Sequence, residues 1–181
     1  MCEDGYQMEG YDRELDSLEF TDFRHDRFAK LTMEQRKYLV ELLVHKTMWF
    51  LTDGAVNPDV KHNTTYSFSA LGEAYYDEME IHINIDLYTP GDEEDVRELV
   101  NVVFHECFHI YEHYCVDTLC EGENCSSAFY YRQIKSWEKN EENYIQSTSS
   151  FFGYQHQPLE SDAMAFSEVM TDRFMEYVYQ E

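Results

Sequence analysis

The segment His105-Glu106-Cys107-Phe108-His109 decides how the rest of the chain is interpreted. Two histidines four residues apart lie on one face of a helix, with Cβ atoms about 6 Å apart, so both imidazoles can bind one Zn²⁺ ion at about 2.0 Å. Glu106 follows the first histidine directly and projects beside the ion, where its carboxylate can accept a proton from zinc-bound water. The motif therefore predicts a zinc site with Glu106 as general base.

The residues around this motif predict a long helix from about Asp92 or Glu93 to Val116. Acidic side chains in its first turn interact favourably with the positive end of the helix dipole. Apolar residues then recur at helical spacing and flank the motif on both sides. The alternative is an ordinary amphipathic helix with two surface histidines, which so apolar a context disfavours.

A catalytic zinc site needs a third protein ligand and an open fourth position. His113 lies two helical turns beyond His105, a rise of about 12 Å, which is too far for both to bind one ion. The metzincin pattern would have glycine and histidine where Glu112 and Cys115 stand. The third candidate is Glu160, in the first turn of a helix predicted to begin at Pro158.

The remaining segments predict a mainly helical α+β domain with a small, largely antiparallel sheet. A capping box at Thr32–Gln35 opens a helix that runs to about Phe50. Strands are predicted over 64–71 and 79–87, and the second alternates apolar with polar residues. After a loop at 117–127 we expect a helix over 128–145, a loop over 147–153 and the final helix.

Composition and charge narrow the classes of function. The chain has 181 residues, 43% of them hydrophobic, which suits one compact domain over 31–181. Residues 1–30 are polar and acidic and predict either a short helix or a mobile lead-in. The net charge of −24 excludes a nucleic-acid partner and disfavours an anionic membrane surface. Five cysteines at these spacings indicate free thiols rather than a disulfide framework, and the alternatives for Cys115, Cys120 and Cys125 are a loop disulfide or a second metal site.

The N-terminus has neither the basic region nor the apolar run of a secretory signal, and no stretch has the roughly 18 apolar residues of a membrane span. The default expectation is therefore a cytoplasmic protein. The sequence indicates no oligomeric state.

The segment 157–163, Gln-Pro-Leu-Glu-Ser-Asp-Ala, resembles the second signature of the gluzincins, in which a later helix supplies a glutamate ligand to an HExxH zinc site. Residues 136–145 resemble the middle helix of small bacterial and phage HExxH proteins akin to the ImmA/IrrE peptidases and the minigluzincins. The resemblance spans roughly Glu80 to Phe174. It implies a zincin-like fold and Asp162 as the partner that orients a ligand histidine. The zinc ligands and the base that it implies are His105, His109 and Glu160, with Glu106.

The resemblance implies a zinc metallopeptidase that acts on a peptide or protein substrate. Hydrogen-bond donors for the developing oxyanion are expected near the second signature, and the candidates are Tyr154, His156 and Tyr144. The strand over 79–87 is expected to pair with the substrate backbone as an edge strand, with His82 either facing the cleft or on the surface. The alternatives are a zinc-containing binding or regulatory protein without catalysis, and an acidic α+β domain with a chance motif.

Overall fold

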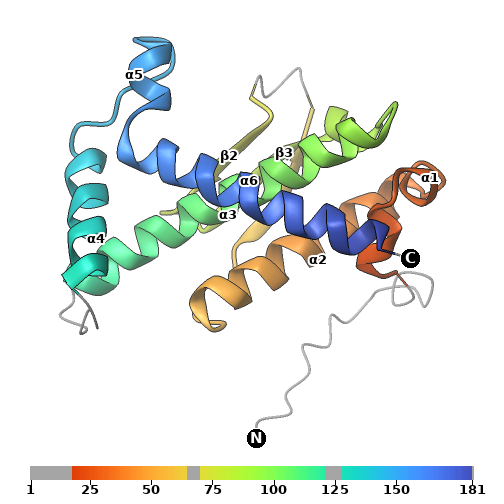
Figure 1. Cartoon of the computed structure of the whole chain (residues 1–181), viewed down its shortest axis with the longest axis horizontal. Helices are drawn as coiled ribbons and strands as arrows, with labels where there is room; N and C mark the ends of the chain where they lie inside the picture. The colour runs from red at the N-terminus through yellow and green to blue at the C-terminus, as the bar shows by residue number, and fades with distance from the viewer. Residues whose placement is uncertain (1–17, 65–69, 121–127, 181) are drawn as a thin grey trace, which may run out of the picture.

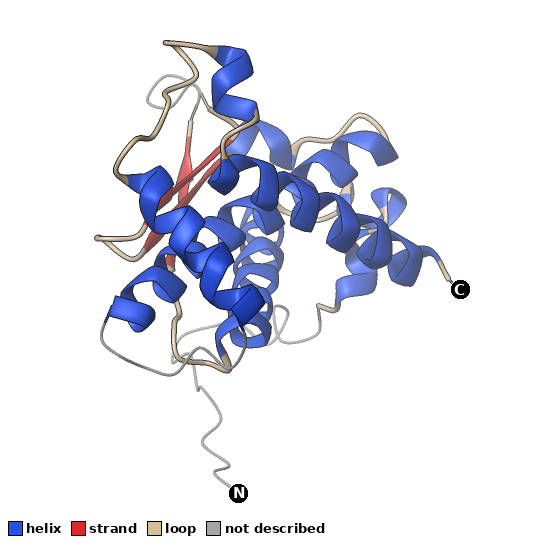
Figure 2. Ribbon diagram, turned by 60° about the vertical axis from the view of Figure 1, so that its left-hand side comes forward, coloured by secondary structure: helices blue, strands red, loops and turns tan. Residues whose placement is uncertain are grey.

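The computed structural model describes residues 18–64, 70–120 and 128–180. The chain is mainly helical, with a three-stranded sheet to one side of the helices, as the α+β prediction requires (Figures 1 and 2). In chain order the elements are the 3-10 helix η1 (Phe20–Phe23), α1 (His25–Phe28), α2 (Met33–Thr52), β1 (Asp59–Asn63), β2 (Gly72–Tyr75), β3 (Glu80–Asn84), the 3-10 helix η2 (Ile85–Tyr88), α3 (Glu93–Cys120), α4 (Ala128–Glu141), α5 (Phe151–Gln155) and α6 (Pro158–Tyr179).

The predicted capping box opens α2. The Thr32 hydroxyl accepts a hydrogen bond from the Gln35 backbone N–H at 3.3 Å, and the Gln35 side chain accepts one from the Thr32 N–H at 2.9 Å. The helix ends at Thr52, and Asp53 follows in the left-handed conformation with φ of 54°. The capping box satisfies backbone N–H groups that would otherwise be unpaired, and the predicted start holds. The end lies two residues beyond the prediction.

The sheet is mixed, which corrects the prediction of a largely antiparallel one. Its order is β1-β3-β2, with β1 parallel and β2 antiparallel to β3. The strand predicted over 79–87 is shorter than expected because the Asn84 side chain accepts a hydrogen bond from the Asp86 N–H at 3.0 Å and starts η2. Of the strand predicted over 64–71, residues 65–69 lie outside the described residues, and the observed strands flank them.

The position of β3 also changes which strand is exposed. β3 lies between the other two strands and is not an edge, so the expectation that 79–87 would pair with a substrate is wrong. β2 is an edge of the sheet and contacts α3. A four-residue turn over 76–79 joins it to β3, with Met79 at a φ of 54°.

Helix α3 is the centre of the fold. It contacts α2, α4, α6 and β2, and α6 lies across it (Figure 1). Val96, Leu99, Val103 and Cys107 are fully buried at the predicted helical spacing, and each large apolar side chain buried in this way contributes about 1.5–3 kcal/mol. The helix runs to Cys120, four residues beyond the prediction. The His105–His109 motif lies inside this helix, which fixes its backbone conformation.

Part of the acidic lead-in belongs to the core. Residues 1–17 lie outside the described residues, but η1 and α1 bury Phe23 and Phe28 completely, with ring centroids 5.5 Å apart. Arg36 of α2 fastens this segment by donating hydrogen bonds to the carbonyl oxygens of Phe28 and Ala29 at 3.1 and 2.8 Å. Residues 20–28 therefore pack as part of the same domain.

The C-terminal third contains three helices, of which α4 and α6 contact α3, and α5 contacts α6. α4 ends at Glu141, earlier than predicted, and α5 occupies part of the segment predicted as a loop. α6 begins at Pro158, as predicted, and buries Leu159 in a second small core with Ile134 and Trp137. None of the described helices is both long enough and apolar enough to cross a membrane. Cys107 and Cys115 are free thiols.

Candidate metal centre

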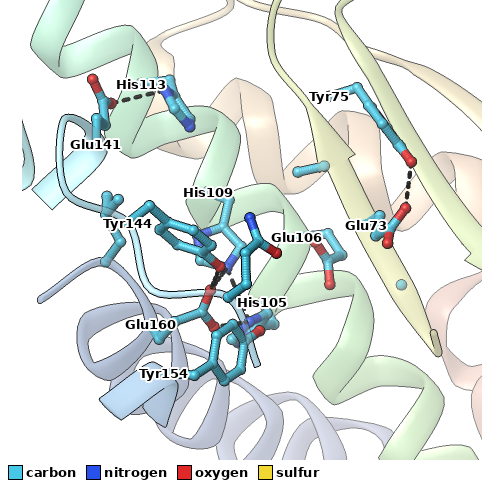
Figure 3. A pocket seen from close by; sticks show the side chains of 14 residues that line it. Glu73, Tyr75, His105, Glu106, His109, His113, Glu141, Tyr144, Tyr154 and Glu160 are labelled. Atoms are coloured by element: carbon cyan, nitrogen blue, oxygen red, sulfur yellow. Dashed lines mark hydrogen bonds and ion pairs between the residues drawn. The ribbon is translucent and has the colours of Figure 1, made fainter. Parts of the chain in front are cut away.

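Two helices bring together three side chains that could hold a metal ion. His105 and His109 lie one turn apart on α3, and Glu160 comes from the first turn of α6 (Figure 3). The two Nε2 atoms are 3.0 Å apart, and the Glu160 carboxylate oxygens lie 3.4 Å from His105 Nε2 and 3.7 Å from His109 Nε2. All three side chains are largely buried. The His-His-Glu group predicted from the sequence is therefore assembled.

The ligand atoms of these three side chains lie within 4.8 Å of one another, close enough to share one ion. Ligand atoms at about 2.0–2.2 Å from Zn²⁺ lie about 3.3–3.6 Å from one another when the geometry is tetrahedral. The two Nε2 atoms are 3.0 Å apart, Glu160 Oε2 lies 3.4 Å from His105 Nε2, and Glu160 Oε1 lies 3.7 Å from His109 Nε2, so the carboxylate is within about this distance of both imidazoles. One carboxylate and two imidazoles form a donor set that binds divalent transition metals, Zn²⁺ among them.

The electrostatics of the group favour a cation. Two imidazole nitrogens 3.0 Å apart repel unless a proton or a metal ion lies between them. Burial lowers the pKa of His109, but hydrogen bonds to Glu112 and Glu160 outweigh it and raise that pKa to about 10. Burial alone would raise the pKa of Glu160. The contacts of its carboxylate with both histidines outweigh burial and hold this pKa below its ordinary value. The group stabilises a positive charge at its centre.

Glu106 lies beside this group and is not one of the three donors. Its side chain is buried, and burial raises its pKa while the two histidines oppose the rise. A carboxylate with a raised pKa is a better proton acceptor than an exposed one. The position and the environment of Glu106 are those required of a general base next to a bound ion.

The carboxylate that orients His109 is Glu112, and this corrects the role predicted for Asp162. Glu112 is fully buried on α3, and its Oε2 accepts a hydrogen bond from His109 Nδ1 at 2.9 Å. That bond leaves Nε2 free to bind a metal. Asp162 instead accepts hydrogen bonds from the side chains of Trp137, at 2.8 Å, and Gln133, so it joins α6 to α4.

Replacing Glu112 with glutamine is expected to lower the affinity for zinc by about 10- to 100-fold, because the amide keeps the shape but loses the charge that supports His109. The matched control is Asp162→Asn, which should leave the affinity within about threefold because its hydrogen bonds go to α4. Competition with a chromophoric zinc chelator measures the zinc affinity of both variants. A larger loss for Asp162→Asn would show that the sequence-based role was correct.

A cavity of about 410 Å³ opens at the metal centre. One side is the edge strand β2, and the other side comes from α3, α6, the last residue of α4 and the segment between α4 and α6 (Figure 3). The side chains nearest the centre are Glu106, Tyr144 and Tyr154. The remaining lining residues are Gly72, Glu73, Ala74, Tyr75, His113, Glu141, Gln146 and Leu159, together with the three metal-binding candidates.

His113 lines this cavity without joining the metal group, as the helical rise predicts. Its Nδ1 lies 2.8 Å from Glu141 Oε1, and its ring stacks on Tyr76 with centroids 5.3 Å apart. His82 lies elsewhere, on the polar side of β3, where it contacts Asn63 at 2.7 Å and Glu80 at 2.8 Å. It is not one of the lining residues.

The three candidate oxyanion donors differ in position. The Tyr144 hydroxyl donates to Glu160 Oε1, and the Tyr154 ring lies edge-on to Tyr144 with centroids 6.2 Å apart, so both reach the centre. His156 is exposed, stacks on Phe152 and contacts the Phe152 carbonyl oxygen at 2.9 Å through Nδ1. The structure places His156 outside the lining of the cavity.

Sequence reasoning missed Glu112 and Gly72. Glu112 carried a usable signal, because a residue three positions after His109 shares its face of the helix. No signal in the sequence indicated Gly72, because the close approach that it allows is between two elements that are distant in sequence.

Comparison with protein-family models, curated proteins and solved structures finds no match for this chain. The resemblance to the gluzincins therefore stays a prediction that rests on the quoted segments. What the site can do must be argued from the chemistry of its own side chains.

Proposed function

We propose that this chain is a zinc-dependent metallopeptidase of the gluzincin type. The observation that carries the proposal is the meeting of Glu160 with His105 and His109, with one ligand atom of each within 4.8 Å of the others and Glu106 alongside. Three protein donors leave a fourth position open, as a catalytic zinc site requires. The cavity at this position gives a substrate access.

The bound ion would supply a Lewis acid that polarises the substrate carbonyl and lowers the pKa of water. Glu106 accepts the proton of that water and delivers it to the departing amine. His109 is held in the right orientation by Glu112, and Glu160 by the Tyr144 hydroxyl. Burial and the neighbouring Glu160 raise the pKa of Tyr154, so its hydroxyl stays protonated and can donate to the carbonyl oxygen as negative charge develops.

The edge strand β2 offers a backbone to a peptide substrate. It is the strand of the described sheet that lines the cavity, and it runs past Glu106. An extended peptide can add to such an edge through main-chain hydrogen bonds, which places its carbonyl groups along the metal centre. In this proposal β2 pairs with the substrate backbone, which is the role predicted from the sequence for residues 79–87.

The charge of the cavity favours a substrate with basic side chains. None of the described lining residues is Lys or Arg, and Glu73 and Glu141 lie in the cavity walls in addition to the carboxylates of the centre. We expect peptides with Lys or Arg beside the cleaved bond to be hydrolysed about 3- to 10-fold faster than their Glu counterparts at low salt, and the difference to shrink at high salt.

Glu141→Gln should reduce this preference, whereas Glu176→Gln, an exposed substitution near the end of α6, should not. Initial rates on a matched set of fluorogenic peptides at two ionic strengths measure the effect. A preference for acidic peptides would contradict the proposed charge complementarity.

Hydrolysis of labelled casein by the zinc-loaded protein tests the proposed function, with the Glu106→Gln protein as the inactive control. Cleavage by the first and not by the second supports a peptidase. Zinc in both proteins with cleavage by neither would instead favour a zinc-containing binding or regulatory protein.

A further inference from the structure

We propose that Gly72 is a positioning residue that sets the place of the Glu106 carboxylate. The inference rests on the proposed function, in which Glu106 is the base. Gly72 opens β2 and faces α3 at the level of the metal centre, where it is among the residues that line the cavity.

The close approach of β2 to α3 depends on the missing side chain of Gly72. A Cβ atom added there would lie 2.7 Å from Val102 Cγ1 and 2.8 Å from both Cγ and Oε1 of Glu106. Carbon atoms in contact are normally about 3.5–4.0 Å apart, so these separations are clashes. Any residue other than glycine at position 72 must move one of its neighbours.

Strand β2 cannot retreat from the helix at small cost. Gly72 pairs with Ile83 of β3, which is fully buried, and the Leu71 carbonyl accepts a hydrogen bond from the Asn84 N–H at 3.0 Å. Val102 is branched at Cβ and therefore has little rotational freedom within α3. The part that can move most readily is the Glu106 side chain.

Packing holds the Glu106 carboxylate where it is. Within the described part of the chain no hydrogen bond to this carboxylate is found, and Gly72 lies against two of its side-chain atoms. The histidines and Glu160 are not among the atoms nearest to a Cβ at position 72. A side chain at position 72 therefore displaces the base and leaves the metal ligands in place.

The Gly72→Ala protein tests this inference, with Gly91→Ala as the matched control. A Cβ at Gly91 would meet only the Asp95 carboxylate, at 3.2 Å on the exposed start of α3. We expect both variants to bind zinc as the wild type does, and Gly72→Ala to unfold at a lower temperature than Gly91→Ala because movement of Glu106 leaves the 2.7 Å contact with Val102 Cγ1. Displacement of a catalytic group by about 1 Å can cost about 100-fold, so Gly72→Ala should lower casein hydrolysis by about that factor and Gly91→Ala by less than about twofold. Wild-type activity in Gly72→Ala would overturn the inference.

A double-mutant cycle separates an action through Glu106 from a general structural effect. In the Glu106→Ala background both side-chain atoms that the added Cβ would meet are absent, so Gly72→Ala should lower the remaining activity there by less than about threefold. Equal losses in both backgrounds would contradict the inference. If Gly72→Ala does not fold, combining it with Val102→Ala removes the 2.7 Å contact and leaves the contact with Glu106 for the same measurement.

The affinity of the zinc-loaded protein for acetohydroxamate can be measured without any substrate hydrolysis. The hydroxamate binds the metal and hydrogen-bonds to the neighbouring base, so Glu106→Gln and Gly72→Ala should weaken it by similar factors. Absence of casein cleavage by the wild type would count against the proposed function, and the hydroxamate would still decide the role of Gly72. Wild-type affinity in Gly72→Ala, or no binding by the wild type, would overturn the inference.

Discussion

The Glu106→Gln protein is expected to hold zinc as well as the wild type and to hydrolyse peptides about 10³-fold more slowly, because general acid–base catalysis contributes about 10²- to 10⁴-fold. Glutamine preserves the volume of the buried side chain and cannot accept the proton. Glu106 is not one of the three donors at the metal centre, so the metal should remain. Zinc content and initial rates on labelled casein are the two measurements.

The matched control for this substitution is Glu98→Gln. Glu98 is an exposed residue on the same helix, and its replacement removes the same charge from α3 without touching the cavity. It should retain wild-type activity. Comparable activity in Glu106→Gln and Glu98→Gln would remove Glu106 from the mechanism, and loss of zinc from Glu106→Gln would mean that the carboxylate is a ligand instead.

Removal of the metal is expected to lower the unfolding temperature by about 10 °C. An ion at 1,000 times its dissociation constant stabilises the folded state by about 4 kcal/mol, and each kcal/mol shifts a domain of this size by about 2–4 °C. Thermal unfolding with and without a chelator, followed by re-addition of zinc, measures the shift. The Glu160→Ala protein is the control, because without the third donor its unfolding temperature should not respond to the chelator. Equal responses of the two proteins would place the stabilising metal elsewhere.

This stabilisation should also depend on pH. In the metal-free protein the carboxylates around His109 raise its pKa from 6.5 to about 10, so its protonated form stabilises the fold fully below about pH 6.5. That contribution is lost as the pH rises from 6.5 towards 10. The metal must also displace the proton from His109. The difference in unfolding temperature between the zinc-loaded and the metal-free protein should therefore be larger at pH 8 than at pH 6.

The parts of the fold that could be predicted are those fixed by neighbours in sequence. The capping box at Thr32 and the proline at the start of α6 act within one helical turn, and both hold in the structure. Burial of Val96 and Leu99 follows from the helical period alone. Pairing between strands is set by contacts across the chain, so the parallel partner of β3 could not be read from its alternating residues.

The candidate site shows the same contrast between residues fixed by neighbours in sequence and residues fixed by contacts between distant elements. His105 and His109 follow from a spacing on one helix. Glu160 was a candidate at the start of a second predicted helix, and only the resemblance implied that this helix supplies the third ligand. Asp162 was expected to orient a ligand histidine, but Glu112 makes the hydrogen bond to His109, and the rotation of α6 about its own axis points Asp162 towards α4. A sequence does not specify that rotation.

The central claim is that His105, His109 and Glu160 bind one metal ion. Metal content by mass spectrometry tests it most directly, on wild-type and Glu160→Ala proteins expressed with added zinc and freed of loosely bound metal by gel filtration. We predict about one zinc ion per wild-type chain and much less in Glu160→Ala, with both proteins folded. Equal zinc in the two proteins, or none in either, would contradict the proposed centre.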